Sequence, residues 1–375
     1  MKKNIICSFI AISSGLFAGE SKISADIQMM NGTAKEYVRN HQNGDKMSRL
    51  DWKIKNIPIL NLGYEYSYNN WEFSVLAKKN IKNNIKSGTM KDYDWYYLGE
   101  DGKVEVTEFG KLEGENLEAW KQSNSGTDEE KAEAKKELAD AYGITVENVD
   151  KYLDIDEETG EIAYIPEAKS RGELSNFSET KNYVKDIIGL DLAARYYVVK
   201  SEKIKVAPML GLNYDRYRFY STSNGIFEEY FPGVKTVTER ESGNSKGITY
   251  KQRFLTPYLG ANIQYSPNSI WDFNIGLKGS LWGRATAQDK HLARGANETL
   301  EKYKNIKFLL LSADIRYHWN ESLTLKGSLA ATKYFYTHKG SSTQTLDDGK
   351  VESIKNGTGL ENKNFSYSLG FEYKF

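Results

Sequence analysis

The chain has 375 residues, and its 51 lysines and arginines are balanced by 51 aspartates and glutamates, so the formal net charge is zero. A neutral chain has no long-range attraction to a polyanion, which excludes nucleic-acid binding driven by overall charge. Outside the N-terminal segment, no window approaches the roughly 18 consecutive apolar residues of a transmembrane helix, so this class of membrane protein is excluded too.

The N-terminal segment predicts export. Two lysines precede a short apolar run at residues 5–17, and small residues follow it. This is the pattern of a secretory signal peptide, whose apolar core is too short to span a membrane. The only cysteine, Cys7, lies inside it, so we expect a mature chain without thiol or disulfide chemistry. We assign residues 1–18 to the signal peptide and residues 19–375 to the exported domain.

About ten segments with alternating apolar and polar residues follow, as expected of strands with one face toward lipid. They lie at about 25–38, 48–67, 71–90, 180–198, 203–220, 247–265, 271–289, 306–319, 322–337 and 359–375. The last one alternates from Phe365 to the terminal Phe375, which is typical of the closing strand of an outer-membrane barrel. Taken alone, that segment also fits an edge strand of a soluble β-sandwich. The signal peptide and the repeated segments favour an all-β fold, a closed antiparallel transmembrane β-barrel of about ten strands that extends above the outer membrane.

The joints between the segments differ in length. Four are very short: Asn69-Asn70, Ser201-Glu202, Ser266-Pro267-Asn268 and Asn320-Glu321. Outer-membrane barrels have short periplasmic turns and long outer loops. Counting strands up and down toward Phe375 therefore places Asp92 and Asp94 at the outer tip of the third strand, facing the cell exterior.

The longest joint is a charged extracellular insertion at about 97–179. Within it, the stretch that begins at Thr127 predicts one or two short helices, with Thr127 as the N-cap and Glu130 completing a capping box. We expect a solvated loop without chemistry of its own rather than a dedicated binding domain.

Two acid-bearing strand ends carry the candidate chemistry. Asp92 and Asp94 lie two residues apart, and Asp289 precedes His291 by two residues at the outer end of the seventh strand. A carboxylate that accepts a hydrogen bond from an imidazole fixes its tautomer and stabilises its protonated form. Most Asp-x-His pairs are surface coincidences. A water held between such a pair and two more carboxylates, however, is placed to lose a proton and attack a carbonyl carbon.

Strict alternation opposes this arrangement on the seventh strand. Trp271 and Ile275 are expected to face lipid, and the same parity would turn Asp289 and His291 outward. We therefore predict a β-bulge between Gly276 and Leu281, because one extra residue reverses the facing of every later side chain.

Five motifs resemble the omptins, the outer-membrane aspartyl-type endoproteases of Gram-negative bacteria. They are RLDWK at 49–53, DYDW at 92–95, YKQRF at 250–254, QDKH at 288–291 and GLENKNF at 359–365. The resemblance covers nearly the whole mature chain. It implies a ten-stranded barrel with an extracellular groove, in which Asp92 and Asp94 form the acid pair and Asp289 and His291 the dyad that activate the attacking water.

The resemblance also implies cleavage near basic residues, with carboxylates holding the basic side chains. Glu36 matches one such position, and Glu173 is a candidate acid for the residue after the cut. Where the family has another acid before the dyad, this chain has Ala287, so we expect the pocket for the residue before the cut to lose charge. Ser175 lies near a family serine once suspected as a nucleophile, but no base is evidently paired with it.

A further family signature is a patch that binds lipopolysaccharide phosphate. Arg216 and Arg253 match it, while Leu212 and Tyr214 replace two other members. A third basic contact is left open among three lysines: Lys302, Lys304 and Lys307. Two arginines on the lipid-facing side of the rim suit lipid phosphates, and snorkelling surface arginines are the alternative.

We therefore expect a monomeric outer-membrane endopeptidase of the aspartic type, acting on peptides and proteins near basic residues. We expect no metal, cofactor or nucleic-acid partner, with lipopolysaccharide as a candidate requirement for activity. The alternative is a non-catalytic adhesin or small pore. A pore is disfavoured because side chains fill most of the lumen of so small a barrel.

Overall fold

The computed structural model describes most of the chain outside its first 18 residues and the predicted insertion. The described ranges are 19–98, 104–105, 121, 126–142, 145–149, 153–155, 162–164, 172–231, 234–240, 245–292, 298–345 and 351–375. The predicted signal peptide and much of the predicted insertion therefore lie outside the described residues.

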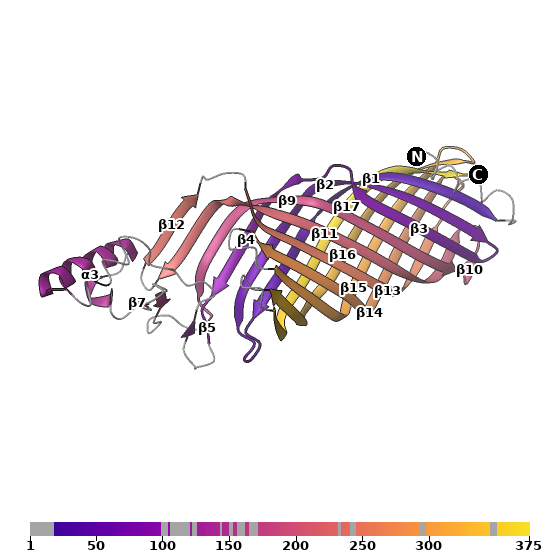
Figure 1. The fold of residues 1–375 in the computed structure, drawn as a ribbon. Coiled ribbons are helices and arrows are strands. Elements are labelled where there is room, and N and C mark those ends of the chain that lie inside the picture. Colours follow the sequence, from indigo (N-terminus) through magenta and orange to yellow (C-terminus); the bar gives the residue numbers. More distant parts are fainter. Residues whose placement is uncertain are drawn as a thin grey trace, which may run out of the picture.

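Ten strand positions form one closed antiparallel ring, which confirms the predicted barrel (Figure 1). The ring closes where β17 pairs with β1. Two strands share the third position, and each pairs with β2 on one side and β9 on the other. They are β3 (Trp71–Asn80), which lies near the chain ends, and β4 (Ile85–Trp95), which lies farther along the barrel. The other ring strands are β1 (Glu20–Arg39), β2 (Lys46–Tyr68), β9 (Leu174–Tyr196), β11 (Ile204–Phe231), β13 (Lys246–Tyr265), β14 (Trp271–His291), β15 (Glu298–His318), β16 (Leu323–Thr345) and β17 (Val351–Lys374).

Apolar side chains cover the outside of the half of the barrel that holds both chain ends. Leu210, Leu259, Ile275 and Leu369 illustrate this surface, with exposed fractions of 59%, 58%, 58% and 75%. Aromatic rings lie near the short turns, in contacting pairs such as Trp71–Tyr196, Trp271–Tyr317 and Tyr317–Trp319. An apolar band edged by aromatic residues is the surface that a barrel presents to lipid. Among the residues that the structure describes, no helix is long and apolar enough to cross a membrane.

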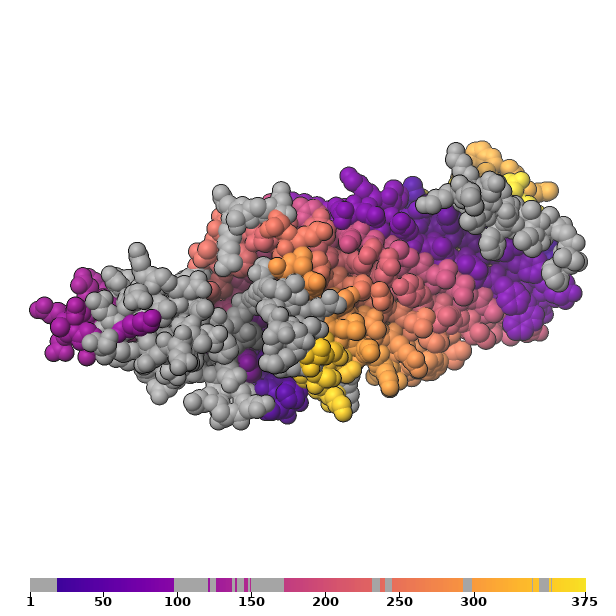
Figure 2. Space-filling model, viewed as in Figure 1, coloured from indigo at the N-terminus to yellow at the C-terminus, as the bar shows by residue number. Residues whose placement is uncertain are grey.

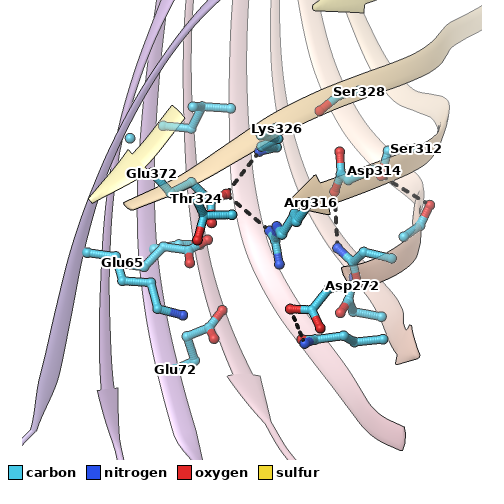
Figure 3. Close-up of a pocket in the computed structure, with 18 of the residues that line it drawn as sticks. Glu65, Glu72, Asp272, Ser312, Asp314, Arg316, Thr324, Lys326, Ser328 and Glu372 are labelled. Carbon is cyan, nitrogen blue, oxygen red and sulfur yellow. Dashed lines mark hydrogen bonds and ion pairs between the residues drawn. The ribbon is translucent and has the colours of Figure 1, made fainter. Parts of the chain in front are cut away.

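The interior of the barrel changes character along its axis. Near the chain ends it holds a polar cavity of about 940 Å³. In its wall, Arg316 and Lys326 of neighbouring strands contact Glu372 at 3.3 and 3.5 Å (Figure 3). Farther along, buried side chains such as Trp52 and Phe254 belong to a continuous apolar core. The cavity therefore ends against this core.

The strands continue well beyond the half that carries this apolar surface, and the described helix of the predicted insertion, α3 (Asp128–Tyr142), lies at the far end (Figures 1 and 2). Thr127 and Glu130 form the predicted capping box: the Thr127 N–H donates to Glu130 Oε2 at 2.8 Å, and the Glu130 N–H donates to Thr127 Oγ1 at 3.4 Å. The described elements of the insertion are β5 (Tyr97–Leu98), β6 (Val104–Glu105), α3 (Asp128–Tyr142), η1 (Val146–Asn148), β7 (Leu153–Ile155) and β8 (Ile162–Tyr164). Two short strands, β10 (Val199–Lys200) and β12 (Val234–Arg240), pair with β11.

The predicted β-bulge on β14 is present, one or two residues later than expected. Pairing with β15 is irregular between Ser280 and Gly283, and the consecutive residues Leu281 and Trp282 both point outward. From this point the parity is reversed, so Asp289 is buried. The bulge therefore turns the end of β14 toward the barrel interior.

The ends of the insertion are tied to each other by backbone hydrogen bonds. The Tyr96 N–H donates to the Glu173 carbonyl at 3.0 Å, and the Gly172 N–H donates to the Tyr96 carbonyl at 2.7 Å.

Deletion of residues 105–165 should therefore leave a folded barrel, because the ring pairing does not use them. We expect the deletion protein to keep the heat-dependent shift in gel migration that marks a folded barrel. Loss of that shift would show that the insertion contributes to barrel folding.

Candidate active site

The two rim aspartates lie on β4, beyond the lipid-facing band. Asp92 is opposite Leu50 of β2 and Asp94 is opposite Ser48. Residues two apart on a strand share a face, and this pair faces the barrel interior, with Asp94 only 6% exposed. The Ser48 hydroxyl donates a hydrogen bond to Asp92 Oδ1 at 3.3 Å. β4 therefore presents two carboxyl groups side by side, as the sequence predicts.

The histidine and its partner lie at the outer end of β14. His291 Nε2 is 2.7 Å from Asp289 Oδ2, and the Asp289 carboxyl is almost fully buried. The neighbouring strand β13 places Tyr250 opposite Asp289 and Ile248 opposite His291. This hydrogen bond holds the imidazole at Nε2 and leaves Nδ1 as the nitrogen that can exchange a proton with another molecule.

The acid pair and the dyad act on each other although their strands are not neighbours in the ring. Burial alone would lower the pKa of the His291 imidazole, but the hydrogen bond and charge of Asp289 and the charges of Asp92 and Asp94 raise it above its ordinary value. The charges of three carboxyl groups therefore act on one imidazole beyond the lipid-facing band, with Asp289 in direct contact. Within the described ranges, no cluster of three or more His, Cys, Asp or Glu side chains forms a metal site.

Glu36, the predicted substrate acid, lies on β1 in the same interior region. It is 3% exposed, and one of its carboxyl oxygens has no hydrogen-bond partner among the described residues. Burial, together with the charges of Asp289, Glu301 and Asp92, raises its pKa well above the usual range. Glu36 is therefore a buried carboxyl within electrostatic reach of both catalytic candidates.

Glu301 is a further acid of this region, which the sequence reasoning missed. It is 1% exposed on β15, where it lies directly opposite Ala287. Asn305 adopts a left-handed backbone with φ of 57°, and the consecutive residues Lys304 and Asn305 both point outward. Strict alternation from Phe308 would put Glu301 outside the barrel, so the irregularity at Asn305 hid it from a pattern search.

The other two residues considered for catalysis and binding lie where β9 begins. Glu173 is exposed just beyond the β4–β9 pairing, near Tyr96. Ser175 is 2% exposed, and its hydroxyl has no hydrogen-bond partner among the described residues. Among the described residues, no base therefore lies within hydrogen-bond distance of the Ser175 hydroxyl.

The two predicted lipopolysaccharide contacts lie together on the outer surface. Arg216 of β11 is directly opposite Arg253 of β13, and both side chains point away from the barrel interior. Arg216 contacts the buried carboxyl of Asp186 at 3.1 Å. Arg253 is in turn opposite Thr286 of β14, and Thr286 is opposite Lys302 of β15. Lys304 is the next outward-pointing residue on β15. Cations on neighbouring strands therefore form one basic patch just above the lipid-facing band.

The fold and this rim define the class of the protein: it is an outer-membrane β-barrel that carries acids and a histidine at its open end. The sequence model of the omptin family matches residues 18–117 and 165–375. The chain is 24% identical over 397 residues to the plasminogen activator of Yersinia pestis, covering 100% of this chain and 99% of that protein. It is 25% identical over 377 residues to the outer membrane protease OmpP of Escherichia coli K12, covering 99% of this chain and 96% of that protein.

The fold agrees with a solved structure. The crystal structure of the outer membrane protease OmpT from Escherichia coli superposes with a TM-score of 0.70 at 17% identity, covering 97% of this chain and 100% of that chain. The chain belongs to the omptin family, and it is an outer-membrane protein related to proteases along its whole length.

The electrostatics of the dyad can be tested by titrating His291. Its pKa should lie above the ordinary histidine value of about 6.5, and Asp289→Asn should lower it because the substitution removes both a charge and an acceptor. Asp94→Asn should lower it by less, since only a distant charge is lost. NMR of the histidine ring signals in micelles measures both shifts, with four histidines to assign. An unchanged pKa in Asp289→Asn would contradict the described pairing.

Proposed function

We propose that this protein is an outer-membrane endopeptidase that cleaves peptides and proteins near basic residues with an activated water molecule. One observation carries the proposal: His291 bonds to Asp289 while it faces the charges of Asp92 and Asp94 at the open end of the barrel. An imidazole with an orienting carboxylate is a general base, and further carboxylates beside it supply acceptors that can hold a water.

In the proposed reaction, neutral His291 removes a proton from the water while the oxygen attacks the substrate carbonyl carbon. Asp289 keeps the ring in one orientation and stabilises the imidazolium that forms. Asp92 and Asp94 position the water and add to this stabilisation. The protonated imidazole then donates its proton to the leaving amine, so the protein forms no covalent intermediate.

The charge of the rim supports a preference for basic substrates. Glu36 is a buried carboxyl close to the dyad, and a cationic side chain beside it would supply the partner that one of its oxygens lacks. Glu173, exposed at the start of β9, is the proposed acid for the residue after the cut. One chain contributes all of these groups, which supports a monomer as the active form.

The interior of the barrel argues against a pore. The polar cavity borders Met30, Met209 and Leu310, which belong to the apolar core or pack against it, and none of the four catalytic candidates lines the cavity. A packed apolar core between the cavity and the outer rim would oppose the passage of polar solutes.

We also propose that the basic patch binds lipopolysaccharide. Arg216, Arg253 and the outward lysines beside them are displayed just above the lipid-facing band, where lipid phosphates would lie. Guanidinium groups form paired hydrogen bonds with phosphate, and phosphate binding would relieve the repulsion between the two facing arginines.

The catalytic assignment predicts large losses in turnover. His291→Ala should lower kcat by about 10²–10⁴-fold, the typical effect of removing a general base, and Asp289→Asn should be nearly as damaging. Asp92→Ala should also impair turnover while the barrel stays folded, because a rim residue contributes little to the core. The measurement is hydrolysis of an arginine-containing fluorogenic peptide in the presence of lipopolysaccharide. His338→Ala, at an exposed histidine elsewhere, is the control, and full activity in His291→Ala would refute the proposal.

The lipid assignment is best tested at Arg253, because loss of Arg216 would also leave the buried Asp186 without one of its partners. Arg253→Gln should raise the lipopolysaccharide concentration needed for half-maximal activity by about tenfold, the value of one charged hydrogen bond. Lys363→Gln changes an outward cation on β17, away from the patch, and should have little effect. Equal lipopolysaccharide responses in both variants would contradict the assignment.

A further inference from the structure

Position 287 departs from the family pattern, and the structure shows what lies beside it. Ala287 points into the barrel and is 1% exposed, so a methyl group occupies the place where the resemblance implies an acid. Directly across the β14–β15 pair is Glu301, whose side chain is equally buried. Side chains opposite each other in an antiparallel pair have Cβ atoms about 4.5–5.5 Å apart. The longer glutamate side chain can therefore bring its carboxyl group into the space that the alanine leaves.

Glu301 is also placed for a ligand. One of its oxygens accepts a hydrogen bond from the Tyr303 hydroxyl at 2.5 Å. The other is buried and makes no hydrogen bond of good geometry in the described part of the chain, with the Thr358 hydroxyl as its polar neighbour. Glu36 has an unpartnered oxygen too, and the charges of Glu36 and Glu301 act on each other. A buried acceptor without a partner is costly, typically by about 1–3 kcal/mol. A cation inserted between the two carboxyl groups would satisfy both.

We propose that Glu301 is the second acid of the pocket for the basic side chain before the cut, in place of the family's acid at position 287. The inference rests on the proposed function and changes one expectation drawn from the sequence. The pocket keeps two carboxyl groups, Glu36 from β1 and Glu301 from β15, so selection for a basic residue is retained despite Ala287.

The pocket should respond to pH. Burial raises the pKa of Glu301 to about 8, although the hydrogen bond from Tyr303 opposes the shift, and burial raises the pKa of Glu36 as well. With a pKa of about 8, Glu301 mostly holds a proton at neutral pH in the free protein, and burial shifts Glu36 in the same direction. A bound cation favours the ionised forms of both groups. Preference for arginine over glutamine should thus increase as pH rises through about 8. The titratable groups that act on this acid pair are Asp92, Asp289, Tyr250 and Tyr303.

The test compares two peptides that differ only in arginine or glutamine before the cut. In Glu301→Gln, the ratio of kcat/KM for arginine to glutamine should fall by at least about tenfold, the value of one charged hydrogen bond. The change should come from the arginine peptide, with the glutamine peptide cleaved nearly as before, and the pH dependence of the ratio should flatten. A loss of folding or of general catalysis would lower kcat/KM for both peptides by the same factor and leave their ratio unchanged.

A second experiment moves the acid from position 301 to position 287. The double variant Ala287→Asp with Glu301→Ala moves the carboxyl group across one strand pair, and it should restore the arginine preference that Glu301→Ala loses. Glu361→Gln, the same change on the outer surface of β17, should leave the ratio unchanged. A ratio in Glu301→Gln within twofold of the unmodified protein, or no restoration in the double variant, would overturn the inference. If the unmodified protein cleaves neither peptide, the proposed function itself fails, and the inference fails with it.

Discussion

Closure of the strand ring is the constraint on which the rest of the structure depends. Hydrocarbon offers no partner to a backbone N–H or C=O, so every strand that crosses it must pair on both edges. The pairing of β1 with β17 removes the two edges that a sheet would otherwise leave open. Because each register is then fixed on both sides, the facing of every side chain is fixed as well, and residues from distant parts of the chain can meet at the rim.

Local breaks in that register put the functional groups inside the barrel. The bulge between Ser280 and Gly283 turns Asp289 inward, and the irregularity at Asn305 does the same for Glu301. Both breaks lie between the lipid-facing band and the rim. A strand can therefore keep an apolar face toward lipid in one half and present acids to the interior in the other, with a short loss of regular pairing between them.

Charge is separated along the axis of the molecule. Apolar side chains fill the middle of the barrel, with a polar cavity on one side and the acidic rim on the other. Since the core excludes water from beneath the rim, carboxyl groups such as Glu36 are buried, and their pKa values rise. The same burial strengthens their attraction to a cation, which connects the packing of the barrel to the proposed preference for basic substrates.

The sequence by itself determined the architecture, because alternation with a period of two and short turns such as Asn69-Asn70 follow directly from the geometry of strands that cross a membrane. It also required a bulge on β14, because only a reversal of the alternation turns the Asp289 side chain toward the barrel interior, where Asp94 points. The tertiary structure decided what depends on pairing between strands. It placed Glu301 opposite Ala287 and Arg216 beside Asp186, and neither contact can be read from one strand, because a neighbour across a sheet is set by register and bulges and not by distance along the chain.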